Sequence, residues 1–249
     1  MEGLMKKTML SVIIALCIVV LTLSICNAGG NDIELASTMV QKQFDDLSKE
    51  VGLIISYIPL APAESLGILG FDIGIEATGA KISSGSTFWE LAISDQKPPD
   101  YIVLPKIHVQ KGLPFGIDVG AMYATAPGTN ISLYGAELKW AVLKGSIVSP
   151  AVAVRGSYTA LAGVADLDAS TYGLDASISK GFGPLTPYAG LGEVWIKAIN
   201  NTNLPLNDVS TSATKLFLGA KLKILLLGVV LQADFSDIQM YSARANISF

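Results

Sequence analysis

The chain has 249 residues, of which 51% are hydrophobic and 15% are charged, and its formal net charge is −4 with a single histidine. A mildly acidic chain without clusters of basic residues is a poor candidate for nucleic-acid binding. The mean hydropathy is positive, at +0.50. The chain must therefore either bury a large core or expose alternate apolar side chains to lipid.

Residues 1–28 have the organisation of a secretory signal peptide. Lys6 and Lys7 precede an apolar run over residues 9–25, and Cys26 and Ala28 place small residues three and one positions before a cut after residue 28. A membrane anchor is the alternative, for which the run is barely long enough. A lipoprotein would need a small residue where Ile25 stands.

Cleavage after residue 28 would set the chemistry of the mature chain. Cys17 and Cys26 leave with the peptide, so the mature chain would have no disulfide and no thiolate metal site. The cut also removes two lysines and Glu2, which changes the net charge from −4 to −5. The roughly 220 residues that remain suit a single domain.

Residues 29–66 are expected to form a helix and a lead-in to the next domain. Asn31 or Asp32 can cap a helix that begins at Ile33. Spacings of 7, 4, 3 and 4 separate the apolar residues Ile33, Val40, Phe44, Leu47 and Val51, which is a helical pattern. This Ile33–Val51 helix could plug a lumen, lie against the membrane or a periplasmic partner, or pack as a simple lead-in under a barrel mouth.

Residues 67–249 change to a period of two, which predicts an all-β domain. Alternating segments lie at about 69–78, 103–110, 115–123, 134–142, 152–159, 171–179, 188–197, 215–224, 229–235 and 241–249. They predict an antiparallel up-and-down barrel of about ten strands, with twelve as the alternative count. With ten strands, the connections near residues 112–114, 145–149, 181–186 and 226–228 fall on one side and are short, while the two longest loops fall on the other.

The last segment of the chain carries a resemblance to a known class. Tyr241, Ala243, Ala245, Ile247 and Phe249 share one face, and polar or small residues take the other. This segment resembles the closing strand of the outer-membrane β-barrel proteins of Gram-negative bacteria, which ends in Phe. The resemblance implies that these five residues form an insertion signal for the barrel assembly machinery, and it places the chain in the bacterial outer membrane with its short turns in the periplasm.

Aromatic residues on the predicted apolar face support a membrane setting, because rings with a polar tip favour the membrane interface. Six tyrosines fall near the external end of the strands, and five aromatic residues fall near the periplasmic end. The two predicted girdles are Tyr101, Tyr123, Tyr134, Tyr158, Tyr172 and Tyr241 at the external end and Phe71, Phe115, Trp140, Tyr188 and Phe249 at the periplasmic end.

The other face of the strands is predicted to line a narrow, charge-filled lumen. Charges of both signs occur there in near balance, which suits a confined interior where they pair with one another. The predicted network is Asp72, Glu76, Lys106, His108, Asp118, Glu137, Lys139, Arg155, Asp175, Glu193, Lys197, Lys215, Lys221, Lys223, Asp234 and Arg244. A soluble lipocalin-like barrel alternates in the same way but turns its apolar residues inward.

No motif in the sequence indicates catalysis. His108 could be drawn as an acid–base group with Lys106, Asp118 and Glu137, but it is more simply a member of the lumen network. The sequence has no G-x-S-x-G elbow, paired-histidine metal spacing or complete nucleotide-binding loop. We therefore predict no catalytic residue, cofactor or metal.

Three functions remain open. The first is a non-enzymatic outer-membrane component with a structural or partner-binding role, in contact with outer-membrane lipid and with a periplasmic or outer-membrane protein bound through the Ile33–Val51 helix. The second is a narrow, plugged, porin-like transporter for small or hydrophobic solutes, since a general porin needs a wider barrel. The third is a soluble periplasmic ligand-binding barrel. The loop over residues 81–99 carries Phe88, Trp89 and Leu91, which predict a binding lip or a lid.

Overall fold

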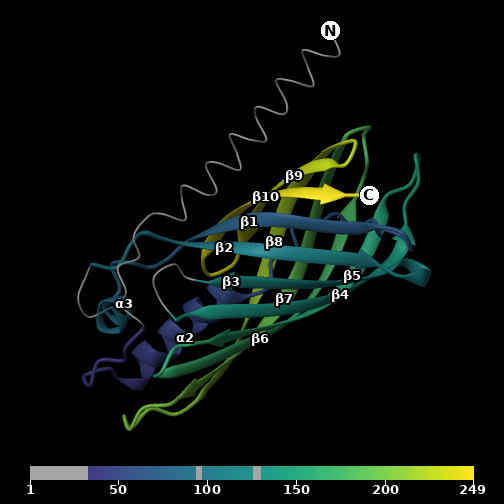
Figure 1. Cartoon of the computed structure of the whole chain (residues 1–249). Coiled ribbons are helices and arrows are strands. Elements are labelled where there is room, and N and C mark those ends of the chain that lie inside the picture. The colour runs from purple at the N-terminus through teal and green to yellow at the C-terminus, as the bar shows by residue number, and fades with distance from the viewer. Residues whose placement is uncertain (1–32, 94–96, 126–129) are drawn as a thin grey trace.

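The computed structural model describes residues 33–93, 97–125 and 130–249. The predicted signal peptide, with both cysteines, lies outside these ranges. Within them, ten strands form a closed antiparallel barrel in which each strand pairs with its neighbours in sequence and β1 pairs with β10 (Figure 1). The predicted fold class and the count of ten strands are confirmed.

The described elements follow one another in a simple order, with two α-helices and one short 3-10 helix among the strands. They are α2 (Gln41–Ile55), β1 (Phe71–Lys81), α3 (Thr87–Ala92), β2 (Tyr101–Gly112), η1 (Pro114–Gly116), β3 (Ile117–Thr125), β4 (Ser132–Lys144), β5 (Ala151–Ala162), β6 (Leu167–Ser179), β7 (Leu185–Asn200), β8 (Val209–Ile224), β9 (Leu227–Phe235) and β10 (Gln239–Ser248). No helix among the described residues is both long and apolar enough to cross a membrane.

The two ends of the barrel differ in their connections. Short turns follow β2, β4, β6 and β8 at one end, which we call the turn end; the connections after β1, β3, β5, β7 and β9 lie at the other, the loop end. Phe71 and Phe249 exchange two backbone hydrogen bonds of 3.0 and 3.1 Å. The barrel domain therefore begins and ends at the turn end, as an even number of strands requires.

The apolar face of the strands points outward. On β4, for example, Tyr134, Leu138 and Trp140 are exposed, whereas Glu137 and Lys139 between them are buried in the lumen. A soluble barrel needs the opposite arrangement, with apolar residues inside. A closed barrel that turns an apolar face outward and charges inward suits a membrane, where every backbone hydrogen bond is satisfied within the sheet.

Most of the predicted aromatic residues lie on this outer face. All six tyrosines of the loop-end girdle are about half exposed, and two pairs of rings from neighbouring strands meet, with centroids 5.2 Å apart for Tyr123–Tyr134 and 4.9 Å for Tyr158–Tyr172. Trp195, which the sequence analysis did not assign to a girdle, pairs with Tyr172 in register and is also exposed. At the turn end, Phe71 and Phe249 lie with their ring centroids 6.0 Å apart.

Strand β7 has the opposite phase to the one predicted. Tyr188, Val194 and Ile196 are buried inside the barrel, while Lys197 is exposed outside. Glu193 also lies on the outer side, where its carboxylate accepts a hydrogen bond of 2.9 Å from Thr214 on β8. Tyr188 is therefore not a girdle residue, and Glu193 and Lys197 do not belong to the lumen network. Both faces of β7 are apolar along much of its length, so the period alone could not decide its phase.

The N-terminal helix begins later and ends later than predicted. The backbone N–H groups of Glu34, Leu35 and Ala36 donate to Ala92, Asp166 and Leu91 of the loops, so this stretch is held to the barrel rather than wound into a helix. The helix α2 begins at Gln41 and continues to Ile55, because residues 51–55 are all small or apolar and all buried.

Candidate functional site: the occupied lumen

The lumen of the barrel is occupied by the chain's own N-terminal segment, residues 33–66, which we call the plug. The helix α2 lies within the loop end beside α3, away from the C-terminus (Figure 1), and packs against β5, β6, β7 and β8. The rest of the plug, residues 56–66, forms neither helix nor strand and runs to the turn end, where β1 begins. We call this part the strap.

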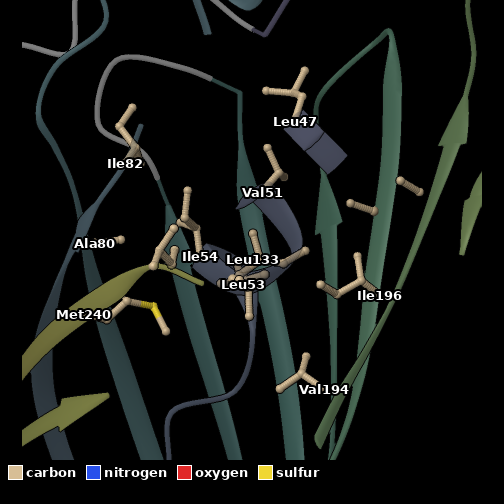
Figure 2. Packing of buried hydrophobic residues seen from close by; sticks show 14 of the residues in the cluster. Leu47, Val51, Leu53, Ile54, Ala80, Ile82, Leu133, Val194, Ile196 and Met240 are labelled. Atoms are coloured by element: carbon tan, nitrogen blue, oxygen red, sulfur yellow. The ribbon is translucent and has the colours of Figure 1, made fainter. Parts of the chain in front are cut away.

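The loop-end half of the lumen is apolar because it receives the helix. Phe44, Leu47 and Leu53 of α2 are fully buried. Figure 2 shows this packing, with α2 side chains facing Leu133, Val194, Ile196 and Met240 of the barrel wall. The prediction of a polar lumen is therefore wrong for this half. The wall is apolar here because it packs against an apolar helix.

The backbone of the plug approaches the wall closely at Gly52. A Cβ atom at this position would lie 2.2 Å from Cγ2 of Ile196 on β7, well inside van der Waals contact. The glycine costs the helix about 1 kcal/mol of propensity relative to alanine. Only glycine fits here, because any side chain would push α2 away from β7.

The loops hold the plug at the loop-end mouth. Glu50 of α2 is buried and accepts hydrogen bonds from Trp89 Nε1 at 2.7 Å and from the backbone N–H of Ser83 at 3.2 Å. Lys49 pairs with Asp237 of the β9–β10 connection at 2.6 Å. Trp89 is itself buried, so the loop after β1 folds over the mouth as a lid and does not present a binding lip.

The strap meets the wall through polar contacts, in addition to burying Ile58 and Leu60 in the apolar core. Lys215 donates to the carbonyl of Tyr57 at 2.9 Å, and Lys139 donates to the carbonyl of Glu64 at 2.8 Å. Ser65 donates to Asp118 at 2.8 Å, and the backbone N–H of Leu66 donates to the same carboxylate at 3.1 Å. A segment with no secondary structure of its own thus finds partners for its backbone groups on the lumen wall.

Most of the predicted lumen charges come together around the strap. Twelve are buried in the lumen: Asp72, Glu76, Lys106, His108, Asp118, Glu137, Lys139, Arg155, Asp175, Lys215, Asp234 and Arg244. The shortest ion pairs join Lys139 to Asp118 and Arg155 to Glu137, both at 2.9 Å. Lys221 reaches Asp72 at 3.3 Å, and Lys223 lies at the turn-end mouth.

His108 has both ring nitrogens engaged by protein groups. Arg244, which can only donate, lies 2.5 Å from Nδ1, so Nδ1 accepts and the ring proton resides on Nε2. Nε2 then donates to the hydroxyl oxygen of Tyr57 at 2.6 Å. The side chain is buried, so His108 connects the strap to the wall and offers neither nitrogen to a substrate.

Two cavities adjoin the strap. One, near the middle of the lumen, is lined by Tyr57, Asp175 and Lys215 and has a volume of about 10 Å³, which is room for one water molecule. The other opens at the turn-end mouth between the strap, Lys221 and Lys223 and has a volume of about 460 Å³. In the part of the chain that the structure describes, no group of three or more His, Cys, Asp or Glu is arranged to hold a metal ion.

Sequence reasoning missed the residues of the plug that bind the wall. No periodic pattern in the sequence predicts the contacts of Tyr57 and Glu50. Their partners, His108 and Trp89, are 51 and 39 residues away in sequence. The one available signal was composition, since an apolar stretch with Pro59 and Pro62 between a helix and a barrel has to be buried somewhere.

Comparisons with known proteins found similarity among solved structures only. No protein-family model matches the sequence, and no curated protein matches it. Three solved structures are similar over 72% of this chain: a KdgM porin (7% identity, 99% of that chain, TM-score 0.38), the N-terminal barrel of Pseudomonas aeruginosa OprF (16%, 97%, 0.32) and Neisserial surface protein A (11%, 95%, 0.30). At these values, no activity of those proteins carries over to this chain.

The location of the protein follows from its own construction. The outward apolar face, the tyrosines at the loop end and an even number of antiparallel strands joined by short turns at one end are features of bacterial outer-membrane barrels. The protein is an outer-membrane β-barrel. In bacterial barrels of this kind the short turns lie on the periplasmic side and the longer loops lie outside; in that orientation the plug enters the lumen from the external mouth.

The contact at Gly52 predicts a specific weakness of the plug. Gly52→Val should destabilise the protein by about 1–3 kcal/mol, the usual cost of overpacking a filled site, and should lower the temperature at which the barrel unfolds on a heat-modifiability gel. Ile196→Ala, which removes the opposing atoms, should restore part of this loss in the double variant.

The matched control is Gly156→Val on β5, where an added Cβ meets no atom within 4 Å. This variant should unfold at the unmodified temperature. Equal effects of the two valine substitutions would show that α2 does not pack against β7 as described.

Proposed function

We propose that the protein is a non-enzymatic, closed outer-membrane barrel that acts as a structural and partner-binding component and presents its external mouth as the binding surface. The observation that carries this proposal is the plug, which is fixed to the loops at one mouth and to Asp118 and Lys139 at the other. A barrel of ten strands is slightly wider than side chains alone fill. The plug supplies the missing volume.

The arrangement of the titratable groups in the lumen does not favour catalysis. His108 shares its two nitrogens with Arg244 and Tyr57, and the carboxylate of Glu137 beside it pairs with Arg155. Farther along the lumen, Asp118 pairs with Lys139. A general base needs a nitrogen or oxygen within reach of a bound substrate. These groups instead reach one another and the strap.

Planar-bilayer conductance tests whether the barrel is closed. The full-length processed protein should give no steady current, because the cavity beside Tyr57 has room for only about one water molecule. A variant lacking residues 33–66 should conduct. If that variant fails to insert, the unmodified protein can be measured in urea below the unfolding midpoint of the barrel, where release of the plug should produce current.

A steady open channel in the unmodified protein would contradict the proposal, and so would an inserted deletion variant that stays silent. Brief openings of the unmodified protein would favour a second function, that of a transporter for small solutes whose plug moves. The feature that favours this second function is the strap, which forms neither helix nor strand and whose backbone is held by hydrogen bonds from Lys139 and Lys215.

The partner-binding part of the proposal concerns the external mouth. The helix lies inside the lumen with its N-terminus toward the outside, so a periplasmic partner could not reach it there. Val40, just before the helix, is 57% exposed, and Lys42 in the first turn is exposed as well. We expect a protein partner to contact this turn together with the surrounding loops.

Photo-crosslinking in intact cells tests this surface. A photoreactive residue at Val40 or Lys42 should capture a partner of defined mass, while the same residue at buried Leu47 should give only crosslinks within the barrel. Recovery of no partner from the exposed positions, or the same partner from Leu47, would count against an external binding role.

A further inference from the structure

The turn end of the barrel carries an exposed apolar ring. Ile147 and Val148 of the β4–β5 turn are 97% and 89% exposed, and Phe115 of the β2–β3 turn is 85% exposed. Each of the four turns contributes, as do the residues before β1 and the C-terminus. The ring consists of Ile68, Leu69, Phe115, Ile147, Val148, Phe182, Leu225, Leu226 and Phe249; we call it the turn rim.

A lysine precedes the apolar tip of every turn. They are Lys111 at the end of β2, Lys144 at the end of β4, Lys180 just after β6 and Lys223 near the end of β8. The turn segments 111–117, 143–151, 180–186 and 223–227 contain no aspartate or glutamate. The four turns therefore combine apolar tips with lysines around the barrel, and the exposed Glu64 of the strap also lies at this end.

The loop end is built in the opposite way. Trp89, Val164, Leu206 and Ile238, each from a different connection, are buried against the plug. Aspartate or glutamate occurs in four of the five loop-end connections, as Glu90, Asp95, Asp100, Asp166, Asp208 and Asp237, and Asp168 is the second residue of β6. Apolar exposure at the turn end is therefore a property of that end and not of connecting segments in general.

Two residues of the turn rim hold backbone angles that favour glycine. Phe115 has φ 64° and Leu225 has φ 56°, in the left-handed region that costs an L residue roughly 1–2 kcal/mol. Glycine would remove that cost at either tip. A large apolar side chain stands there instead, which indicates that the tip itself needs to be apolar.

Two of the lysines satisfy the backbone carbonyls of the tips. Lys180 Nζ donates to the carbonyls of Ser146, Ile147 and Ser149 at 2.6–3.3 Å, and Lys111 Nζ donates to those of Ile68 and Gly70 at 2.7 and 3.1 Å. In water these carbonyls would need no such partners. In a poorly hydrated environment each unsatisfied carbonyl is costly, so these contacts suit tips that leave water.

We propose that the turn rim is an anchoring surface embedded in the headgroup region of anionic phospholipid in the periplasmic leaflet. Apolar tips would enter the boundary between headgroups and acyl chains, while the lysines would meet phosphate. The ring comes from every turn of the closed barrel, which matches the way lipid surrounds a barrel, whereas a protein partner would cover one sector. This role concerns a different surface from the external mouth and does not depend on the plug.

Depth measurements in vesicles test the proposal. Protein cleaved after residue 28, which therefore lacks Cys17 and Cys26, carries a single cysteine as Ile147→Cys, Leu225→Cys or Asn203→Cys, the last in the exposed β7–β8 loop, and is labelled with an environment-sensitive nitrobenzoxadiazole dye. The protein is then inserted into vesicles of phosphatidylethanolamine and phosphatidylglycerol, and folding is checked by heat-modifiability. Emission from positions 147 and 225 should be blue-shifted and quenched by lipid spin-labelled near the headgroup, whereas position 203 should resemble water and stay unquenched.

The charge contribution is measured separately. In Lys144→Gln and Lys223→Gln, the preference for spin-labelled phosphatidylglycerol over phosphatidylcholine should fall by up to about fivefold per lysine, from the ~1 kcal/mol that a surface lysine contributes. Lys42→Gln at the external mouth should leave the preference unchanged. Unquenched, water-like emission at both 147 and 225 would overturn the proposal and leave the ring as a protein-binding surface. Quenching without any effect of the lysine variants would overturn the anionic lipid as the ligand.

Discussion

The volume of the lumen is the constraint on which the rest of the structure depends. A barrel of about ten strands encloses more space than inward side chains alone fill, and water in that space would leave the apolar residues of β7 and β8 exposed. The chain resolves this by filling the lumen with its own residues 33–66. The helix occupies the loop-end half, where the wall is apolar, and the strap occupies the turn-end half, where the wall supplies the charged groups that bind the strap backbone.

The charged residues of the lumen fix the position of the strap and do not simply make the lumen polar. Buried ion pairs are a weak source of stability, because desolvation offsets much of their attraction, but removing one partner typically costs about 3–5 kcal/mol. Lys139 pairs with Asp118, and both also bind the strap. Such a shared network penalises other placements of the strap, so the charges fix its path more than they add to the total stability.

The barrel could be read from the sequence where one face of a strand was apolar and the other was not. On β4 and β10 the alternation of Leu138 with Lys139, or of Ile247 with Asn246, leaves a single choice of phase. On β7 it failed, because Ile196 faces α2 and Trp195 faces lipid, and both are apolar environments. The strap contacts were out of reach for another reason, since Tyr57 and His108 meet only through the closure of the whole barrel.

The path of the plug through the lumen is tested most directly by cysteine labelling in intact cells. Ser37→Cys and Glu64→Cys lie at exposed positions near the two ends of the plug, with the unmodified protein as the blank. A membrane-impermeant maleimide should label position 37 in intact cells and position 64 only after the outer membrane is permeabilised. Labelling of position 64 in intact cells while position 37 stays protected would contradict the account, because the N-terminal segment would then not enter from the outside.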